Sequence, residues 1–307
     1  MCLVASPAAA WHDAGHRLTA EIAFDLLDAN QQERVTAILR AHPRYRQDFV
    51  ASMPDAIVNG SEHAKARWIF AHASNWPDQV ATRGKSVREK YQYSTWHYIN
   101  LPVFLTTEDE AAMADELDNN VSIDFSPPLR HGLNIVQASK GNLLVWRNDA
   151  ATDQEKAVAL CWILHLVGDL HEPLHNVALF SSAYFPEGDR GGNLIRIRQA
   201  KDISNLHAVW DSLADRFTTL TPDDATRELL KNDVADIESI PGWARTYRDM
   251  AAEFAYPEEV RRKLLAQPPG RDYPTITLSR KYITTASKLA ESQILIAGHR
   301  IAALISN

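Results

Sequence analysis

Residues 154–175 of this chain read QEKAVALCWILHLVGDLHEPLH. Apolar residues recur here at helical spacing and on most sides, which predicts a helix over residues 154–171 that is buried at the centre of the fold. His165 and Asp169 stand four residues apart on this helix, so their side chains share one face. A histidine and an aspartate on one face of a buried helix indicate a functional site rather than ordinary core packing.

Other segments of the chain show the same helical periodicity. Helices are predicted over residues 17–29, 131–147 and 279–305, and from about Asn205 onward. Loops are predicted for the Pro- and Gly-rich stretches 183–193 and 267–274, and a short strand for the alternating residues 193–198. We therefore expect one all-α, mainly helical domain with at most a short β-hairpin.

The composition limits the function classes. The chain has 307 residues, 45% of them hydrophobic, which suffices for one large core. It lacks a run of about 18 apolar residues, so no membrane span is expected. Thirty-two basic residues against 39 acidic ones give a formal charge of -7, which argues against nucleic-acid binding through a broad basic surface. Two cysteines do not provide a disulfide framework.

The first ten residues, MCLVASPAAA, carry no charged side chain and end in Ala-Ala-Ala. This pattern is typical of the end of a secretory signal peptide with an A-x-A cleavage site, although a basic start is missing. A disordered tail is the alternative. We interpret residues 1–10 as the remnant of a signal peptide and residues 11–307 as the domain, and we expect the protein to be secreted or periplasmic.

The segment from His165 to His175 contains three imidazoles and an aspartate. This combination suits zinc better than magnesium or calcium, which prefer shells made of oxygen. With further candidates near the start of the chain and after Asn205, about nine ligands are available, whereas one zinc needs three or four. Three zinc ions and three aspartates would give a pocket of about +3, which attracts phosphate inside an acidic protein.

Two interpretations of His171-Glu-Pro-Leu-His175 are open. It literally matches H-E-x-x-H, the zinc-peptidase motif, which needs one continuous helical turn. Pro173 disfavours that turn because it lacks an N–H, so it ends the helix and places His175 in the following turn. In the alternative, His175 joins the ligands of the preceding helix, while His171 and Glu172 either support the site or face solvent. The proline favours the alternative.

Six motifs follow one another along the chain: Trp11-x4-His16, Asn75-Trp-Pro-Asp78, Trp96-His97-Tyr98, His165-x3-Asp169-x5-His175, Gly191-Gly-Asn193 and Asn205-Leu-His207-x3-Asp211. Together they resemble the zinc-dependent single-strand nuclease and 3′-nucleotidase family, which includes fungal nucleases of the S-one and P-one type and plant bifunctional nucleases. The resemblance implies the mainly helical fold that these nucleases share with zinc phospholipase C.

The resemblance also implies a trinuclear zinc site. Its ligands would be Asp78, His97, His165 and Asp169 for the first zinc, His175, His207 and Asp211 for the second, and Trp11, His16 and Asp169 for the third. Asp169 would bridge the first and third ions. Trp11 would bind through its α-amine and carbonyl oxygen, which requires it to be the first residue. Asp55, after Met-Pro, is a rival to Asp78, which we expect in a loop.

The reaction is implied in the same way. A bridged zinc pair lowers the pKa of a shared water, and the resulting hydroxide would attack phosphorus in line while the second zinc stabilises the departing 3′-oxygen. We assign catalysis to Asp169 and Asp78, acting through the metal. The expected substrates are single-stranded DNA, single-stranded RNA and 3′-mononucleotides, cleaved to leave 5′-phosphates on nucleic-acid products. No obligate protein partner is implied.

Three residues are candidates for substrate contact. Tyr98 stands at the family's base-stacking aromatic, and stacking tolerates any base but requires an unstacked one. A packed core tyrosine is the alternative. Asn100 stands where an acidic residue often reads the base, and its amide can both donate and accept. Asn193, on a glycine-rich turn, is the candidate for contact with the phosphate.

One position departs from the family pattern. Three residues after the first-zinc aspartate, where relatives commonly carry a basic residue that touches the phosphate, this chain has Ala81. Arg83 or Lys85 is a hypothetical substitute. Two other functions also remain open: a zinc phospholipase C on the same fold, which would need an apolar groove for acyl chains, and a non-catalytic zinc-binding protein.

Overall fold

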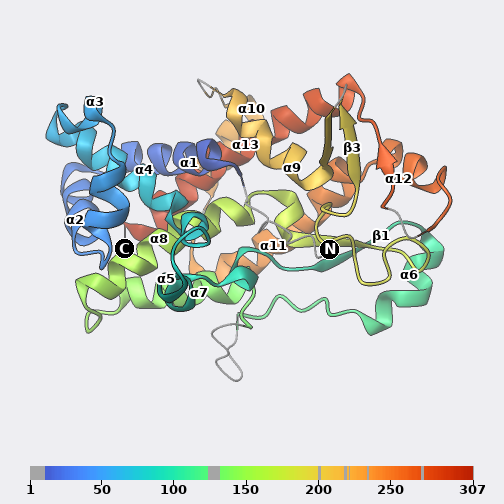
Figure 1. Cartoon of the computed structure of the whole chain (residues 1–307), viewed down its shortest axis with the longest axis horizontal. Coiled ribbons are helices and arrows are strands. Elements are labelled where there is room, and N and C mark those ends of the chain that lie inside the picture. Colours follow the sequence, from blue (N-terminus) through green and yellow to red (C-terminus); the bar gives the residue numbers. More distant parts are fainter. Residues whose placement is uncertain are drawn as a thin grey trace.

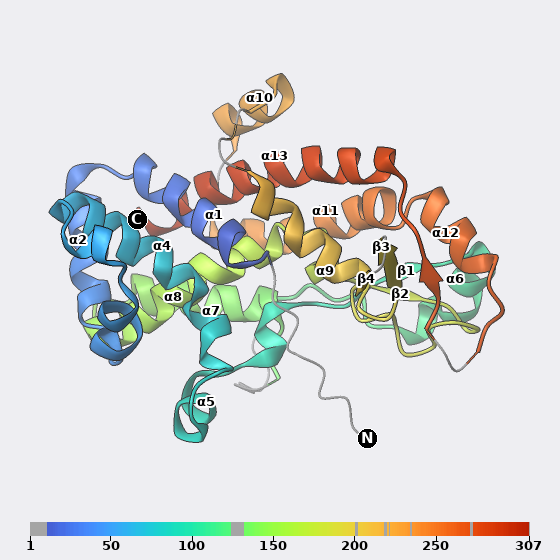
Figure 2. The same ribbon diagram turned by 45° about the horizontal axis from the view of Figure 1, so that its top comes forward.

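The computed structural model describes residues 11–123, 132–199, 202–217, 220, 222–233, 235–270 and 273–306. The signal-peptide interpretation of residues 1–10 lies outside this part. The fold is mainly helical, as predicted (Figure 1). Its strands gather toward one end of the molecule, and α1, α2 and α4 lie toward the other (Figures 1 and 2).

The α-helices are α1 (Asp13–Leu26), α2 (Ala29–Arg40), α3 (Asp55–Val58), α4 (Glu62–Val80), α5 (Lys85–Tyr91), α6 (Thr107–Met113), α7 (Ile135–Arg147), α8 (Asp153–Leu170), α9 (Leu206–Asp211), α10 (Asp224–Asn232), α11 (Ile240–Met250), α12 (Glu258–Leu265) and α13 (Arg280–Ile305). Shorter helical turns are η1 (Tyr45–Phe49), η2 (Val50–Ser52), η3 (Ser94–His97), η4 (Ala114–Glu116), η5 (Pro173–Asn176), η6 (Ser212–Arg216), η7 (Ile237–Ser239) and η8 (Ala251–Ala255). The strands are β1 (Leu101–Phe104), β2 (Val177–Phe180), β3 (Arg196–Gln199), β4 (Asp202–Asn205) and β5 (Thr275–Ile276).

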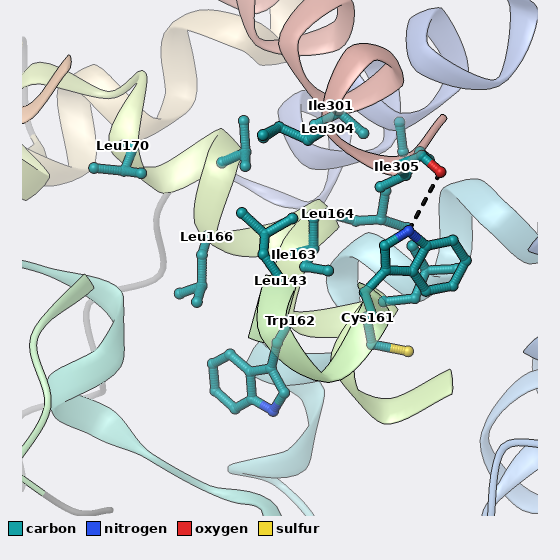
Figure 3. Close-up of a cluster of buried hydrophobic side chains, with 14 of the residues drawn as sticks. Leu143, Cys161, Trp162, Ile163, Leu164, Leu166, Leu170, Ile301, Leu304 and Ile305 are labelled. Carbon is teal, nitrogen blue, oxygen red and sulfur yellow. Dashed lines mark hydrogen bonds between the residues drawn. The ribbon is translucent and has the colours of Figure 1, made fainter. Parts of the chain in front are cut away.

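Helix α8 is the central helix of the core. Thr152 and Glu155 form a reciprocal capping box at its start, and it ends at Leu170, before Pro173, as predicted. It packs against α1, α2, α4, α7 and α13, which explains why its sequence is apolar on most sides. In Figure 3 its side chains meet those of α7 and α13, and the dashed line marks the indole N–H of Trp146 donating to the carbonyl oxygen of Ile305 at 3.3 Å.

Two predicted helix boundaries are corrected. The segment 17–29 does not form one helix, because Asp28 and Gln31 form a capping box that starts α2 after α1 has ended. The helix predicted over 131–147 begins four residues later, at Ile135, because Asn134 caps it. Both corrections come from short polar side chains that bond backbone N–H groups, a signal that hydrophobic periodicity does not contain.

The strands form two small sheets. The predicted strand near 193–198 is β3, which pairs antiparallel with β4 as a hairpin and parallel with β5. Beyond that hairpin, β1 and β2 form a parallel pair with Leu101 opposite Val177. Because η3 ends shortly before β1 and η5 directly precedes β2, this pairing brings His97 and His175 together. The N–H of Ile99 donates to the carbonyl oxygen of His175 at 2.9 Å.

A membrane-spanning helix is not found among the described residues, since no helix there is both long and apolar enough.

Candidate metal centre

Helix α8 supplies the two central polar side chains of the site. His165 and Asp169 lie one turn apart and are fully buried, with Nε2 of His165 3.3 Å from Oδ2 of Asp169. The Nδ1 atom of His165 faces the carbonyl oxygen of Ser74 on α4 at 2.7 Å and donates to it. In the neutral ring Nε2 then carries the lone pair, so the imidazole is oriented to bind a cation beside Asp169.

His97 and Asp78 complete this first cluster. His97, at the end of η3, places Nδ1 3.1 Å from Oδ2 of Asp169 and 2.9 Å from Nε2 of His165. The Oδ1 atom of Asp78 lies 3.5 Å from Nε2 of His165 and 3.7 Å from Nδ1 of His97. The predicted ligands of the first zinc therefore come together from α4, η3 and α8.

Asp78 lies on the last turn of α4, not in the expected loop, because Pro77 removes one N–H without ending the helix. Its rival Asp55 is exposed on α3 and belongs to none of the candidate metal-binding groups in the described part of the chain. The geometry therefore favours Asp78.

The other carboxylate oxygen of Asp169 faces a different histidine. Its Oδ1 lies 3.2 Å from Nε2 of His16 on α1, whose ring stacks on that of His165 with centroids 4.1 Å apart. Asp169 thus presents Oδ1 to His16 and Oδ2 to His97 and His165, which is the arrangement that a ligand bridging two cations needs.

Trp11 lies just before the start of α1, the helix that carries His16. Its side chain is fully buried and packs so closely on α1 that a Cβ added at Gly15 would lie 2.6 Å from the Cβ of Trp11. The next residue, His12, donates its backbone N–H to the carbonyl oxygen of Asp211 at 3.2 Å. This bond joins the start of α1 to the end of α9.

A second buried cluster consists of four side chains whose candidate ligand atoms lie within 4.8 Å of one another: Glu172, His175, His207 and Asp211. His175 lies on η5, and α9 carries His207 and Asp211 on one face as predicted. Nδ1 of His175 donates to the carbonyl oxygen of His97 at 2.6 Å, and Nδ1 of His207 donates to that of Gly191 at 2.8 Å. Both histidines therefore keep the lone pair on Nε2.

Several buried polar atoms of the two clusters lack a hydrogen-bond partner: Nε2 of His16, His175 and His207, Oδ1 of Asp169 and Asp211, and Oε1 of Glu172. Unpaired buried polar groups are costly, and buried charges are normally paired or bind metals. The chemistry of this donor set, imidazole nitrogen with carboxylate oxygen, matches zinc. The residues therefore fit metal ions.

The two clusters differ electrostatically. Burial alone would raise the pKa of Asp169, but His165 and the other imidazoles around it hold that pKa well below its ordinary value. Burial would lower the pKa of His165, yet Asp169 and Asp78 raise it to about 9. In the second cluster, burial and the neighbouring Glu172 raise the pKa of Asp211 well above its ordinary range. Neighbouring imidazoles therefore stabilise the charged form of the carboxylates in the first cluster, whereas burial and the nearby Glu172 disfavour the charged form of Asp211 in the second.

Comparison with known proteins agrees with this geometry. The chain matches the S1/P1 Nuclease family over residues 11–307. It belongs to the S1/P1 nuclease family. Endonuclease 1 of Arabidopsis thaliana is 27% identical over 214 residues, which cover 69% of this chain and 55% of that protein. Endonuclease 5 of the same plant is 23% identical over 288 residues, 85% of this chain and 84% of that protein.

A fungal member is also similar. Nuclease S1 of Aspergillus oryzae is 31% identical over 64 residues, which cover 21% of this chain and 19% of that protein. Of the plant relatives, Endonuclease 1 is matched over about half of its own length. S1/P1 nucleases are metalloenzymes, and membership of the family supports hydrolysis of ester bonds in nucleic acids by this chain.

Two of the predicted substrate residues line one groove of about 270 Å³: Tyr98 and Asn100. The ring of Tyr98 is 38% exposed, so it is not a packed core tyrosine. Asn193 is not among the residues that line this groove, and its amide donates to the carbonyl oxygen of Arg190 at 2.9 Å. The structure therefore brings together the two residues expected at the base and leaves Asn193 apart from them.

The substitutes considered for Ala81 are engaged elsewhere. Nε of Arg83 lies 3.4 Å from the buried carboxylate of Asp48, and Nζ of Lys85 lies 3.6 Å from Glu89 on the exposed α5. Neither cation belongs to the residues that line the groove of Tyr98.

His171 and Glu172 do not face solvent, since both are fully buried. His171 turns away from the clusters: its Nδ1 donates to the carbonyl oxygen of Val167 at 2.6 Å, and Arg300 donates to its Nε2 at 3.0 Å. Its lone pair is therefore occupied, which removes it from a peptidase-type zinc site. Glu172 belongs to the second cluster, although the sequence did not single it out as a ligand. The literal H-E-x-x-H match was the available signal.

Replacing Gly168 with alanine is expected to displace His16. A Cβ at Gly168 would lie 2.7 Å from Nδ1 of His16, so the ring must move away from Asp169. We expect one metal ion per chain to be lost and activity to fall about 10- to 100-fold, measured by metal analysis and hydrolysis of single-stranded DNA. Gly242→Ala on α11, where nothing lies within 4 Å of the added Cβ, is the control. Normal metal content in the Gly168 variant would contradict this packing argument.

Proposed function

We propose that this chain is a zinc-dependent nuclease and 3′-nucleotidase. It cleaves single-stranded DNA and RNA to products with 5′-phosphates and removes phosphate from 3′-mononucleotides. The observation that carries the proposal is the carboxylate of Asp169, whose two oxygens face His16 on one side and His97 with His165 on the other. A single buried carboxylate between two groups of imidazoles supports a centre with more than one metal ion.

Three zinc ions are proposed on the ligand sets that the family resemblance implies: Asp78, His97, His165 and Asp169; His175, His207 and Asp211; and Trp11, His16 and Asp169. Zinc in such a centre polarises a phosphoryl oxygen and lowers the pKa of water to near neutrality. The role of Trp11 requires a free α-amine, since an amide nitrogen has no lone pair to offer. We therefore also propose that the protein is processed to begin at Trp11 and is secreted or periplasmic.

The protein's own residues orient the reaction. Asp169 fixes the spacing of the two cations it would bridge, and the carbonyl oxygens of Ser74, His97 and Gly191 hold three ligand rings in one tautomer. Tyr98 offers an exposed ring on which an unstacked base can lie, worth about 1–3 kcal/mol. A base inside a duplex cannot reach that ring, which accounts for the proposed single-strand preference.

The groove of Tyr98 offers both kinds of contact that a nucleotide base needs. Its lining combines Tyr98 and the apolar side chains of Ile99 and Leu133 with polar side chains, among them Thr95 and Asn100. An aromatic ring stacks on the face of a base, and hydrogen-bonding groups suit its polar edge. This mixture supports the nuclease proposal, whereas the acyl chains of a phospholipid would require a continuous apolar wall.

Phosphate release from 3′-AMP tests the proposal, using protein confirmed to begin at Trp11 and 5′-AMP as the control substrate. We expect zinc-dependent release from 3′-AMP alone, together with cleavage of single-stranded DNA. Activity confined to phosphatidylcholine would establish the phospholipase. Bound zinc without hydrolysis of any of these substrates would establish a zinc-binding protein.

A further inference from the structure

We infer that Glu172 is a fourth protein ligand of the second metal site, beside His175, His207 and Asp211. This inference rests on the proposed zinc dependence and extends it, because the ligand set proposed above contains only the last three residues. It concerns this chain's own H-E-P-L-H segment, in which the first histidine has a different task from the glutamate.

The carboxylate of Glu172 is held in an orientation that suits metal binding. The side chain is fully buried, and its Oε2 accepts the backbone N–H of His175 at 2.8 Å, which caps the start of η5. This bond fixes the plane of the carboxylate and leaves Oε1 as a buried oxygen without a partner. The candidate ligand atoms of Glu172 and the other three residues lie within 4.8 Å of one another, so one cation can contact all four.

The neighbouring groups are oriented toward the same point. His175 and His207 each donate a hydrogen bond from Nδ1 to a backbone carbonyl, which leaves an unpartnered lone pair on Nε2. Their rings lie 4.8 Å apart between centroids. Oδ1 of Asp211 is likewise buried and without a partner. Four unpartnered acceptor atoms, two nitrogens and two oxygens, form the donor set of a four-coordinate zinc.

The charges lead to the same conclusion. Among the described residues, no lysine or arginine forms an ion pair with Glu172 or Asp211, and Nε2 of His207 lies 3.7 Å from Oδ2 of Asp211. Two carboxylates side by side in a buried site repel each other unless a cation lies between them. The carboxylates of Glu172 and Asp211 would together neutralise the charge of one divalent cation bound between them.

The end of α8 explains how Glu172 reaches this position. The helix stops at Leu170, so the backbone of Glu172 is extended and its side chain turns toward η5. His171 points the other way and is held by Val167 and Arg300. His171 therefore anchors α8 to α13, while Glu172 and His175 of the same motif would bind metal.

Four protein ligands would make the second site closed, in the manner of structural zinc sites. Two carboxylates cancel the charge of one zinc ion, so this ion would be held more tightly and be less electrophilic than an ion bound by His175, His207 and Asp211 alone. A substrate oxygen could join it only as a fifth ligand.

Glu172→Gln tests the inference through metal content rather than activity. The amide keeps an oxygen to accept the N–H of His175 but replaces the second oxygen with an NH₂ group, which cannot bind zinc. We expect the variant to lose one of three zinc ions at a free chelator concentration at least about 100-fold lower than the wild type requires. Asp109→Asn is the control, since Asp109 is a buried carboxylate that only accepts from Ser182 and Thr106. We expect its zinc retention to match the wild type.

Equal zinc retention in Glu172→Gln and wild type would overturn the inference while leaving the proposed function intact. Wild-type protein that binds no zinc would instead overturn the proposed function. If the variant does not fold, anomalous diffraction at the zinc edge from wild-type crystals decides: we expect Oε1 of Glu172 at about 2.0–2.2 Å from an ion, and an ion bound only by the other three residues contradicts the inference.

Discussion

Asp169→Asn is expected to lower the rate of hydrolysis of single-stranded DNA by at least about a thousandfold. Asparagine has one oxygen and one NH₂ group where the aspartate has two oxygens. Because Oδ1 faces His16 and Oδ2 faces His97 and His165, the NH₂ group must face one of these groups in either orientation. It binds no cation there, so the bridge between the two proposed ions is lost. The measurements are the initial rate at saturating zinc and the zinc content of the variant.

The control for this substitution is again Asp109→Asn, which removes one buried carboxylate charge outside both clusters. We expect it to keep the wild-type rate. A wild-type rate in Asp169→Asn would contradict both the bridging role of Asp169 and the proposed mechanism. A large loss of rate in both variants would point to a general effect of removing buried charge.

The parts of the site that share one helix could be predicted from the sequence. His165 with Asp169 on α8, and His207 with Asp211 on α9, stand four apart, and helical geometry alone places each pair on one face. The buried position of α8 followed in the same way from its apolar composition. Local periodicity therefore predicted the central helix and the shared face of each of these two pairs.

Other features depend on contacts that no local pattern contains. His97 meets His175 because β1 and β2 pair in parallel, although about eighty residues separate them. The role of Glu172 depends on how the chain leaves α8 before Pro173, and a different turn would send its carboxylate to solvent. The sequence offers Arg83 as a phosphate contact, but in the fold its guanidinium lies beside the carboxylate of Asp48. For His97 and Arg83 the deciding partner is distant in sequence, so the residue's own neighbours did not reveal it.

Removing the metal is expected to lower the midpoint of thermal unfolding by about 10 °C or more. A site with free metal at a thousand times its dissociation constant contributes about 4 kcal/mol, and for a domain larger than 150 residues each kcal/mol shifts the midpoint by about 2–4 °C. Several such sites are proposed here, around the fully buried side chains of Asp169, His165 and Glu172. Without a cation the two carboxylates of the second cluster face each other unpaired, which adds to the cost. Calorimetry before and after dialysis against a chelator measures the shift.

Metal add-back separates a specific effect from general damage by the chelator. Zinc should restore the unfolding midpoint, whereas magnesium at the same free concentration should not, because it prefers oxygen ligands and the clusters are rich in imidazole. His207 is an informative variant: His207→Ala removes one nitrogen ligand from the second cluster only, so it should reduce the chelator-dependent shift without abolishing it. An unfolding midpoint that does not respond to chelation in the wild type would show that the clustered imidazoles and carboxylates are stable without a cation, and the zinc sites proposed here would have to be abandoned.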